Sequence, residues 1–109
     1  MPYDASLERR IDGLTAQLGP VTKKKMFGGV GYLVNGNMCF GIHKDRLILR
    51  TSAEAAEELL RDEHFKVFDM TGRPMPGWLS ISPEAAKSDG QLLSILRQGF
   101  QYAEKLRAK

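Results

Sequence analysis

The sequence predicts an α+β domain in which helices pack on a single antiparallel sheet of about five strands, in the order α-β-β-β-α-β-β-α. Two observations lead to this class. An Asn35-Gly36 pair interrupts an apolar stretch, and these residues tolerate the positive φ angles of a tight hairpin turn. Near both ends of the chain the apolar residues recur at helical spacing, whereas in the middle they form short runs.

The first helix is indicated by one apolar face. Asp4 or Ser6 can act as its N-cap, and Gly19-Pro20 ends it, because proline cannot continue the hydrogen-bond ladder. The residues that define the face follow one another at spacings of four, three and four: Leu7, Ile11, Leu14 and Leu18.

Three strands follow as an antiparallel meander. Residues 26–34 and 38–43 are joined at Asn35-Gly36, and a second short turn at Lys44-Asp45 leads into residues 46–50. In the third of these strands Leu47 and Leu49 alternate with residues of a second face, which we expect to be exposed to solvent. That second face consists of Arg46, Ile48 and Arg50.

The second half of the chain predicts a helix, two strands and a closing helix. Thr51 and Glu54 match a capping box, which predicts a helix over residues 53–61. Residues 65–70 and 78–82 are the next strands, separated by a loop rich in proline and glycine. Ser88 with Gln91 forms another capping box, and the apolar face of the helix that it opens is Leu92, Leu96, Phe100, Ala103 and Leu106.

Length and composition predict one domain over residues 1–109. The chain is 42% hydrophobic and 27% charged, which is ordinary for a globular protein. A single cysteine, Cys39, and the lack of a signal sequence favour the cytoplasm. The longest uncharged stretch, residues 26–43, is divided by the Asn35-Gly36 turn, so we expect no membrane association. The net charge of +3 permits contact with phosphates but does not require it.

The glycine-rich stretch does not match a phosphate-binding loop. Gly28, Gly29 and Gly31 precede a hairpin, whereas a phosphate loop leads into a helix N-terminus. We interpret these glycines as letting a strand bulge, bend or lie against a bulky neighbour such as a helix. A surface that a ligand approaches closely is the alternative.

The sequence offers no convincing catalytic or metal site. Cys39 and His43 would lie about 13 Å apart on a strand, at roughly 3.3 Å per residue, which is too far for a shared ion. A Cys39 and His64 pair is compatible with the sequence, but a chain with one cysteine and two histidines allows such a pair by chance. The carboxylates on the exposed side of the second helix are typical of a solvated face. We therefore predict no enzyme activity, no metal and no cofactor.

The densest basic run is Lys23, Lys24 and Lys25. Phe27 and Tyr32 follow it, but five residues of separation place these rings on opposite faces of a regular strand. We interpret the run as a solvated basic loop at the start of a strand. The alternative is a weak nucleic-acid contact to which three arginines contribute, namely Arg46, Arg50 and Arg73.

Residues 19–51 resemble the amino-terminal domain of the TfoX/Sxy family of competence regulators. The likeness rests on a lysine before the motif "MFGG", on Gly31 and on the Asn35-Gly36 turn, and it extends over about residues 7–106. Residues 65–85 also resemble the family, through Phe65, Gly72, Pro74, Met75, Trp78 and Pro83-Glu84.

The resemblance implies an α+β fold and a domain without catalytic activity. Such domains occur in bacterial regulators of natural competence and as free-standing proteins, and the full regulators carry a second, carboxy-terminal helical domain. Because the chain ends at residue 109, we expect the free-standing form.

Two functions follow as hypotheses. The first is a regulatory module that binds a partner protein, or a second copy of itself through its sheet edges; the second is the weak nucleic-acid contact. The candidate interaction surface consists of Lys23, Lys24, Lys25, Phe27, Gly28, Gly29, Gly31 and Arg73.

Overall fold

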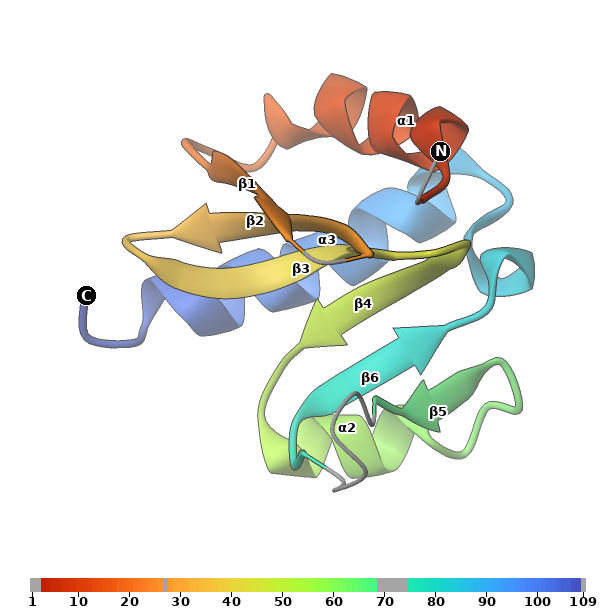
Figure 1. Cartoon of the computed structure of the whole chain (residues 1–109). Helices are drawn as coiled ribbons and strands as arrows, with labels where there is room; N and C mark the ends of the chain where they lie inside the picture. The colour runs from red at the N-terminus through yellow and green to blue at the C-terminus, as the bar shows by residue number, and fades with distance from the viewer. Residues whose placement is uncertain (1–2, 27, 69–74, 109) are drawn as a thin grey trace.

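The computed structural model describes residues 3–26, 28–68 and 75–108, and there it forms one six-stranded antiparallel sheet with helices (Figure 1). The strand order across the sheet is β1-β2-β3-β4-β6-β5. The strands are β1 Thr22–Met26, β2 Gly29–Val34, β3 Asn37–His43, β4 Arg46–Arg50, β5 Phe65–Val67 and β6 Trp78–Ile81. The helices are α1 Ala5–Thr15, α2 Ala53–Leu59 and α3 Asp89–Glu104, with a 3₁₀ turn, η1, at Pro83–Ala86.

The predicted fold class is confirmed, and the sheet gains a strand at its start. Residues 22–26, expected as a loop, pair with β2 as the edge strand β1. The stretch expected as one strand over residues 26–34 is therefore divided by a turn, in which Gly28 has a φ of +76°. The strand expected over residues 65–70 is shorter and ends at Val67; residues 69 and 70 lie outside the described part.

The local signals for the turns and for two helix starts are confirmed. Asn35 and Gly36 both have positive φ angles, 53° and 84°, as the hairpin requires. Asp4 caps α1 by accepting hydrogen bonds from two backbone N–H groups. Ser88 and Gln91 form the expected reciprocal capping box at the start of α3.

The N-cap of α2 was predicted one residue too early. Ser52, not Thr51, accepts a hydrogen bond from the backbone N–H of Ala55. Thr51 is buried, and its backbone N–H donates to the carbonyl oxygen of Gly77. Contact with the loop before β6 therefore takes Thr51 out of the capping position.

One face of the sheet, called here the inner face, forms the core. The helix α3 passes behind the sheet in Figure 1 and contacts β2, β3 and β4, while α1 packs on α3 and α2 on β6. By register and burial, the inner face consists of Val30, Tyr32, Phe40, Ile42, Leu47, Leu49, Phe65, Leu79 and Ile81.

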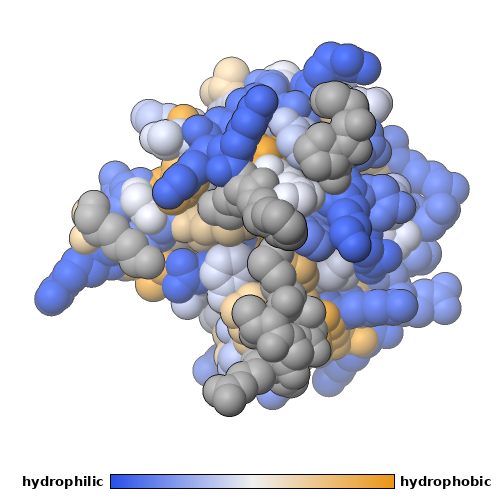
Figure 2. All heavy atoms as spheres, viewed as in Figure 1, coloured by the Kyte–Doolittle hydropathy of each residue, from blue (hydrophilic) through white to orange (hydrophobic). Residues whose placement is uncertain are grey.

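The opposite face, called here the outer face, carries residues of the alternate register. One row across it is Lys24, Gly31, Gly41, Ile48, Ser80 and Lys66. In Figure 2, drawn from the same side as Figure 1, hydrophilic residues cover most of the described surface, and hydrophobic ones show only in small separate areas.

The expectation of a solvent-exposed second face on β4 is wrong for its central residue. Ile48 is only 2% exposed, although it points away from the main core. The outer face also carries three rings, those of His43, Phe68 and Trp78. The ring centroid of Phe68 lies 5.8 Å from that of His43 and 6.5 Å from that of Trp78. The outer face is thus a second, smaller packed layer.

Candidate functional site

The basic run is divided between the two sides of the edge strand β1. Lys23 and Lys25 pair with Tyr32 and Val30 of the inner face, whereas Lys24 pairs with Gly31 of the outer face. Neighbouring side chains of a strand point in opposite directions. The three lysines therefore do not form one basic patch.

Lys23 is held by α1. Its Nζ lies 2.9 Å from Oε2 of Glu8 and 2.8 Å from Oδ2 of Asp12. The other carboxylate oxygen of Asp12 accepts a hydrogen bond from the hydroxyl of Tyr32 at 2.7 Å. The hydrogen bonds to Asp12 and then to Glu8 raise the pKa of Lys23. These contacts give Lys23 a structural role, which joins the edge strand to the first helix.

Two glycines of the candidate surface, Gly29 and Gly31, lie where the backbones of β2 and β3 pack closely. A Cβ on Gly29 would overlap the carbonyl oxygen of Ile42 on β3, and Gly31 lies opposite Gly41 in the same strand pair. The bulky neighbour that the sequence suggested is thus the backbone of β3, not a helix. Phe27 and Arg73, the other members of the predicted surface, lie outside the described residues.

The arginines of the predicted nucleic-acid contact are engaged within the fold. Arg46 donates from Nε to the hydroxyl of Ser80 at 2.6 Å and from Nη2 to its carbonyl oxygen at 3.2 Å. The guanidinium of Arg50 lies 5.2 Å from the ring centroid of Trp78 and 5.8 Å from that of Tyr102. Both arginines are half-buried and contribute packing as well as charge.

The cysteine and the two histidines lie in different surroundings. Cys39 is fully buried, its thiol donates to the carbonyl oxygen of Tyr32, and burial raises its pKa to about 12. Nδ1 of His64 lies within hydrogen-bonding distance of Oδ1 of Asp62, at 2.9 Å. Burial lowers the pKa of His43, and the nearby charge of Lys44 adds to this effect. In the described ranges, no three side chains of His, Cys, Asp or Glu are grouped so as to hold a metal ion.

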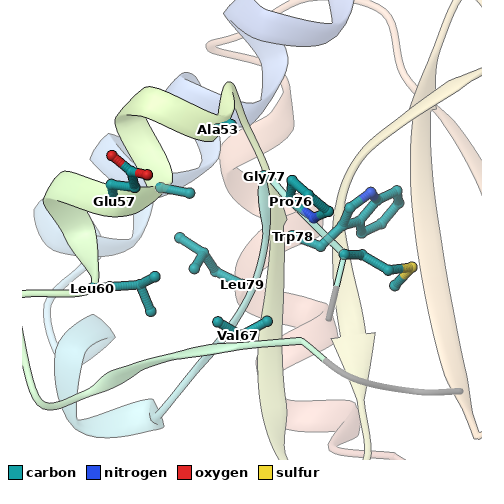
Figure 3. Close-up of a pocket in the computed structure, with 10 residues that line it drawn as sticks. Ala53, Glu57, Leu60, Val67, Pro76, Gly77, Trp78 and Leu79 are labelled. Atoms are coloured by element: carbon teal, nitrogen blue, oxygen red, sulfur yellow. The ribbon is translucent and has the colours of Figure 1, made fainter. Parts of the chain in front are cut away.

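The structure adds a site that the sequence analysis missed, a pocket of about 160 Å³ between α2 and the segment leading into β6 (Figure 3). We call it the α2–β6 pocket. Glu57 stands at one side, and the other walls are mostly apolar. The pocket is lined by Ala53, Ala56, Glu57, Leu60, Val67, Met75, Pro76, Gly77, Trp78 and Leu79.

Val67 connects this pocket to the edge of the sheet. It is the last residue of β5, which pairs with β6 on one side and with no described strand on the other. With 41% of its surface accessible, Val67 is the exposed large hydrophobic residue of the described chain. The alternation Phe65-Lys66-Val67 could have suggested an inward-facing valine, but not that α2 would leave a pocket beside it.

The family assignment follows from a comparison with family models. A model described as the TfoX N-terminal domain matches residues 13–103, which reach from within α1 almost to the end of α3. The chain belongs to the TfoX N-terminal domain family. The resemblance inferred from the sequence is thereby confirmed. A search of curated proteins gave no match.

The match to the TfoX N-terminal domain includes all six strands and both features described above, the glycine-marked strand pair and the α2–β6 pocket. Within the part of the chain that the structure describes, no helix of this TfoX N-terminal domain is long and apolar enough to cross a membrane.

Proposed function

We propose that this TfoX N-terminal domain is a non-enzymatic regulatory module that binds a partner protein at the β5 edge and the adjacent α2–β6 pocket. The observation that carries the proposal is the position of Val67, which belongs to both features and is exposed. An edge strand offers unpaired backbone groups, and a neighbouring pocket accepts a side chain of the chain that pairs with it. These are the two requirements for recognition of an extended peptide.

The two edges of the sheet differ in a way that supports β5 as the binding edge. Strand β1 carries Lys23, Lys24 and Lys25, and lysines on an edge discourage pairing with another chain. Strand β5 carries a single lysine, Lys66, next to the exposed Val67. A partner strand thus meets fewer lysines and more apolar surface at β5.

The proposal includes the absence of catalytic activity. This part rests on the surroundings of the side chains that could act in catalysis, namely Cys39 and the glutamates of α2. A nucleophilic cysteine needs its thiolate form and access to substrate, whereas Cys39 is buried and its pKa is raised to about 12. The glutamates of α2 are exposed, and a row of exposed charges on a helix is typical of a solvated face.

Nucleic-acid binding is the second candidate, and one observation favours it. The described strands contain no Asp or Glu, and Lys24 and Lys66 both lie on the outer face. Against it, Lys23 is neutralised by α1 and the two arginines of β4 are engaged within the fold. We therefore rank it below partner-protein binding.

A pull-down from a lysate of the cell of origin, with and without nuclease, separates the two functions. The variants are Val67→Lys, which places a charge at the pocket, and Lys24→Ala/Lys25→Ala, which removes charge from β1. Thr22→Lys is the matched control, because it adds the same charge to an exposed position on the opposite edge.

A partner protein that resists nuclease, is lost with Val67→Lys and is kept by the other variants supports the proposed function. Recovery that disappears with nuclease and with the double lysine variant, but not with Val67→Lys, assigns the domain to nucleic acid.

A further inference from the structure

The segment that contains α2 and β5, which supplies part of the α2–β6 pocket, is acidic, in contrast to the chain as a whole. Between residues 53 and 67 there are five carboxylate side chains and two basic ones, while the full chain has a net charge of +3. Two of these carboxylates lie at the pocket or next to it: Glu57 lines the pocket, and Glu54, three residues before it on α2, is its neighbour on the helix surface. We call Glu54 and Glu57 the acidic rim.

The acidic rim takes part in no ion pair among the described residues, and two nearby basic side chains are paired elsewhere. Arg61 pairs with Glu58 at 3.7 Å, and His64 holds Asp62. No described ion pair involves Glu54, Glu57 or Glu63, and all three are exposed. Glu57 lies on the pocket wall itself (Figure 3). A bound group beside this part of α2 thus meets carboxylates that form no ion pair with any described residue.

The pocket has the size and polarity for one apolar side chain. An apolar cavity of about 150 Å³ holds a molecule the size of benzene, and the α2–β6 pocket measures about 160 Å³. Leu60, Val67, Trp78 and Leu79 supply apolar walls of the kind that hold an aliphatic or aromatic anchor.

Building on the proposed function, we infer that the occupant is an extended segment of a partner protein, with one large apolar anchor flanked by Lys or Arg. The anchor fills the α2–β6 pocket, the backbone follows β5, and the flanking cations face the acidic rim. Opposite charges across an interface speed association and select the partner.

The acidic rim also argues against a second copy of this chain as the occupant. Symmetric pairing of two β5 strands would place two identical acidic rims near each other, and like charges oppose association. A partner rich in Lys or Arg removes this repulsion.

Selection from a random peptide display library tests the inference. Wild-type protein, Glu54→Gln/Glu57→Gln and Val67→Lys are each used as bait, and the selected peptides are synthesised for fluorescence anisotropy. Glu84→Gln/Glu104→Gln is the matched control, since it removes the same charge from exposed positions on η1 and α3.

Wild-type protein should select peptides in which a large aliphatic or aromatic residue is flanked by Lys or Arg. The rim variant should weaken their binding by roughly two- to five-fold per charge removed, as expected for exposed ion pairs, and the matched control should not. Val67→Lys should abolish it.

The contrary outcomes are distinguishable. Peptides with an apolar anchor but no basic flanks, or with unchanged affinity for the rim variant, overturn the charged occupant and leave the proposed function standing. Concentration-dependent dimerisation in sedimentation that Val67→Lys abolishes also overturns the inference, in favour of a second copy. If nothing is selected, or if the peptides bind Val67→Lys as tightly as wild type, the proposed site itself is wrong.

Discussion

Gly99 of α3 lies directly against the backbone carbonyl of Cys39 on β3. A Cβ at Gly99 would overlap that carbonyl oxygen, and it would also come within 2.9 Å of Cδ1 of Leu49. The helix therefore approaches the sheet at a distance that only glycine permits. Because α3 contacts three strands, this one position sets how closely the main helix covers the inner face.

Gly99→Ala should destabilise the domain by about 1–3 kcal/mol, because an overpacked core forces neighbouring groups to shift. Alanine is intrinsically better than glycine inside a helix by about 1 kcal/mol, so the clash must outweigh this gain. Urea unfolding followed by circular dichroism measures the difference.

Gly13→Ala is the control for that measurement. Gly13 lies in α1 with nothing within 4 Å of its hypothetical Cβ, so alanine there should leave stability unchanged or raise it by up to about 1 kcal/mol. Equal urea midpoints for the two variants would contradict the close approach of α3.

The sequence predicted those elements whose signals are local. The Asn35-Gly36 turn and the Ser88 capping box each depend on a few neighbouring residues, and both occur where expected. Strand β1 was missed because Lys23, Lys24 and Lys25 lack apolar alternation. They form a strand through pairing with β2 and through the contact of Lys23 with α1, which no local pattern reveals.

The candidate site was predicted less well than the fold. The lysine run was identified, but its division between two sides depends on the register of β1. The α2–β6 pocket joins residues 53–60 to residues 75–79, so it arises from packing between segments that are distant in sequence. Sequence periodicity identifies the apolar side of α2 but not a gap left beside it.

Lys23→Met should destabilise the protein modestly at neutral pH, by roughly 1 kcal/mol, because Lys23 is partly exposed and its ion pairs are screened by solvent. The pKa of Lys23 is raised in the fold by hydrogen bonds to Asp12 and Glu8. Its contribution to stability is thus complete below the ordinary lysine pKa and is lost as the pH rises through the higher folded-state pKa.

The difference between wild type and Lys23→Met should accordingly be constant around neutral pH and shrink above about pH 10.4. Urea titrations over this range measure it. Lys25→Met is the control, since Lys25 is exposed on the same strand and takes part in no ion pair among the described residues, so its replacement should leave the free energy of unfolding unchanged. If the difference in unfolding free energy between wild type and Lys23→Met grew at alkaline pH, the stabilising contact of Lys23 with Asp12 and Glu8 would be refuted.

Cys39 should be unreactive in the folded protein. Its side chain is fully buried, and burial raises its pKa to about 12, so little thiolate is present or accessible near pH 8. We expect a chromogenic disulfide reagent to modify Cys39 only as fast as the domain opens, with the rate rising as urea is added. Protein in concentrated guanidinium chloride provides the control and should react at once. Rapid, complete modification of the native protein would show that the thiol is accessible and would reopen the case for a catalytic cysteine.

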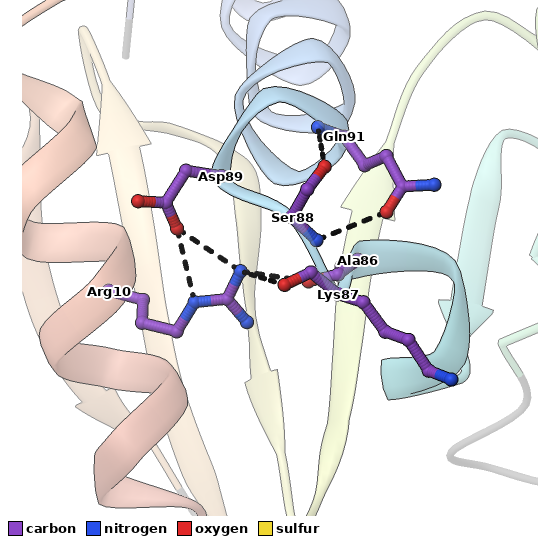
Figure 4. A network of polar contacts seen from close by, with 6 residues as sticks. All are labelled: Arg10, Ala86, Lys87, Ser88, Asp89 and Gln91. Carbon is purple, nitrogen blue, oxygen red and sulfur yellow. Dashed lines mark hydrogen bonds and ion pairs between the residues drawn. The ribbon is translucent and has the colours of Figure 1, made fainter.

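Arg10→Lys should destabilise the junction between α1 and α3, although the charge is kept. The guanidinium Nη2 donates to the carbonyl oxygens of Ala86 and Lys87, at 2.9 and 3.3 Å, and both Nε and Nη2 donate to Oδ1 of Asp89, at 3.4 and 3.2 Å (Figure 4). A lysine ammonium lacks the planar fork that spans these acceptors. We expect a loss of about 1–2 kcal/mol in unfolding free energy, whereas Arg9→Lys, at an exposed neighbouring position, should have no effect.

A double-mutant cycle of Arg10→Ala and Asp89→Ala separates the two kinds of acceptor. The side chain of Asp89 is 72% exposed, so its ion pair with Arg10 should contribute less than about 1 kcal/mol. The carbonyl oxygens of Ala86 and Lys87 end the η1 turn and lose their charged donor when Arg10 is removed. Arg10→Ala should therefore lower the free energy of unfolding by nearly as much in the Asp89→Ala protein as in the wild type. Arg10→Ala should also make amide hydrogen exchange faster in the first turn of α3. A coupling energy as large as the whole Arg10→Ala effect would instead place the stabilisation in the ion pair.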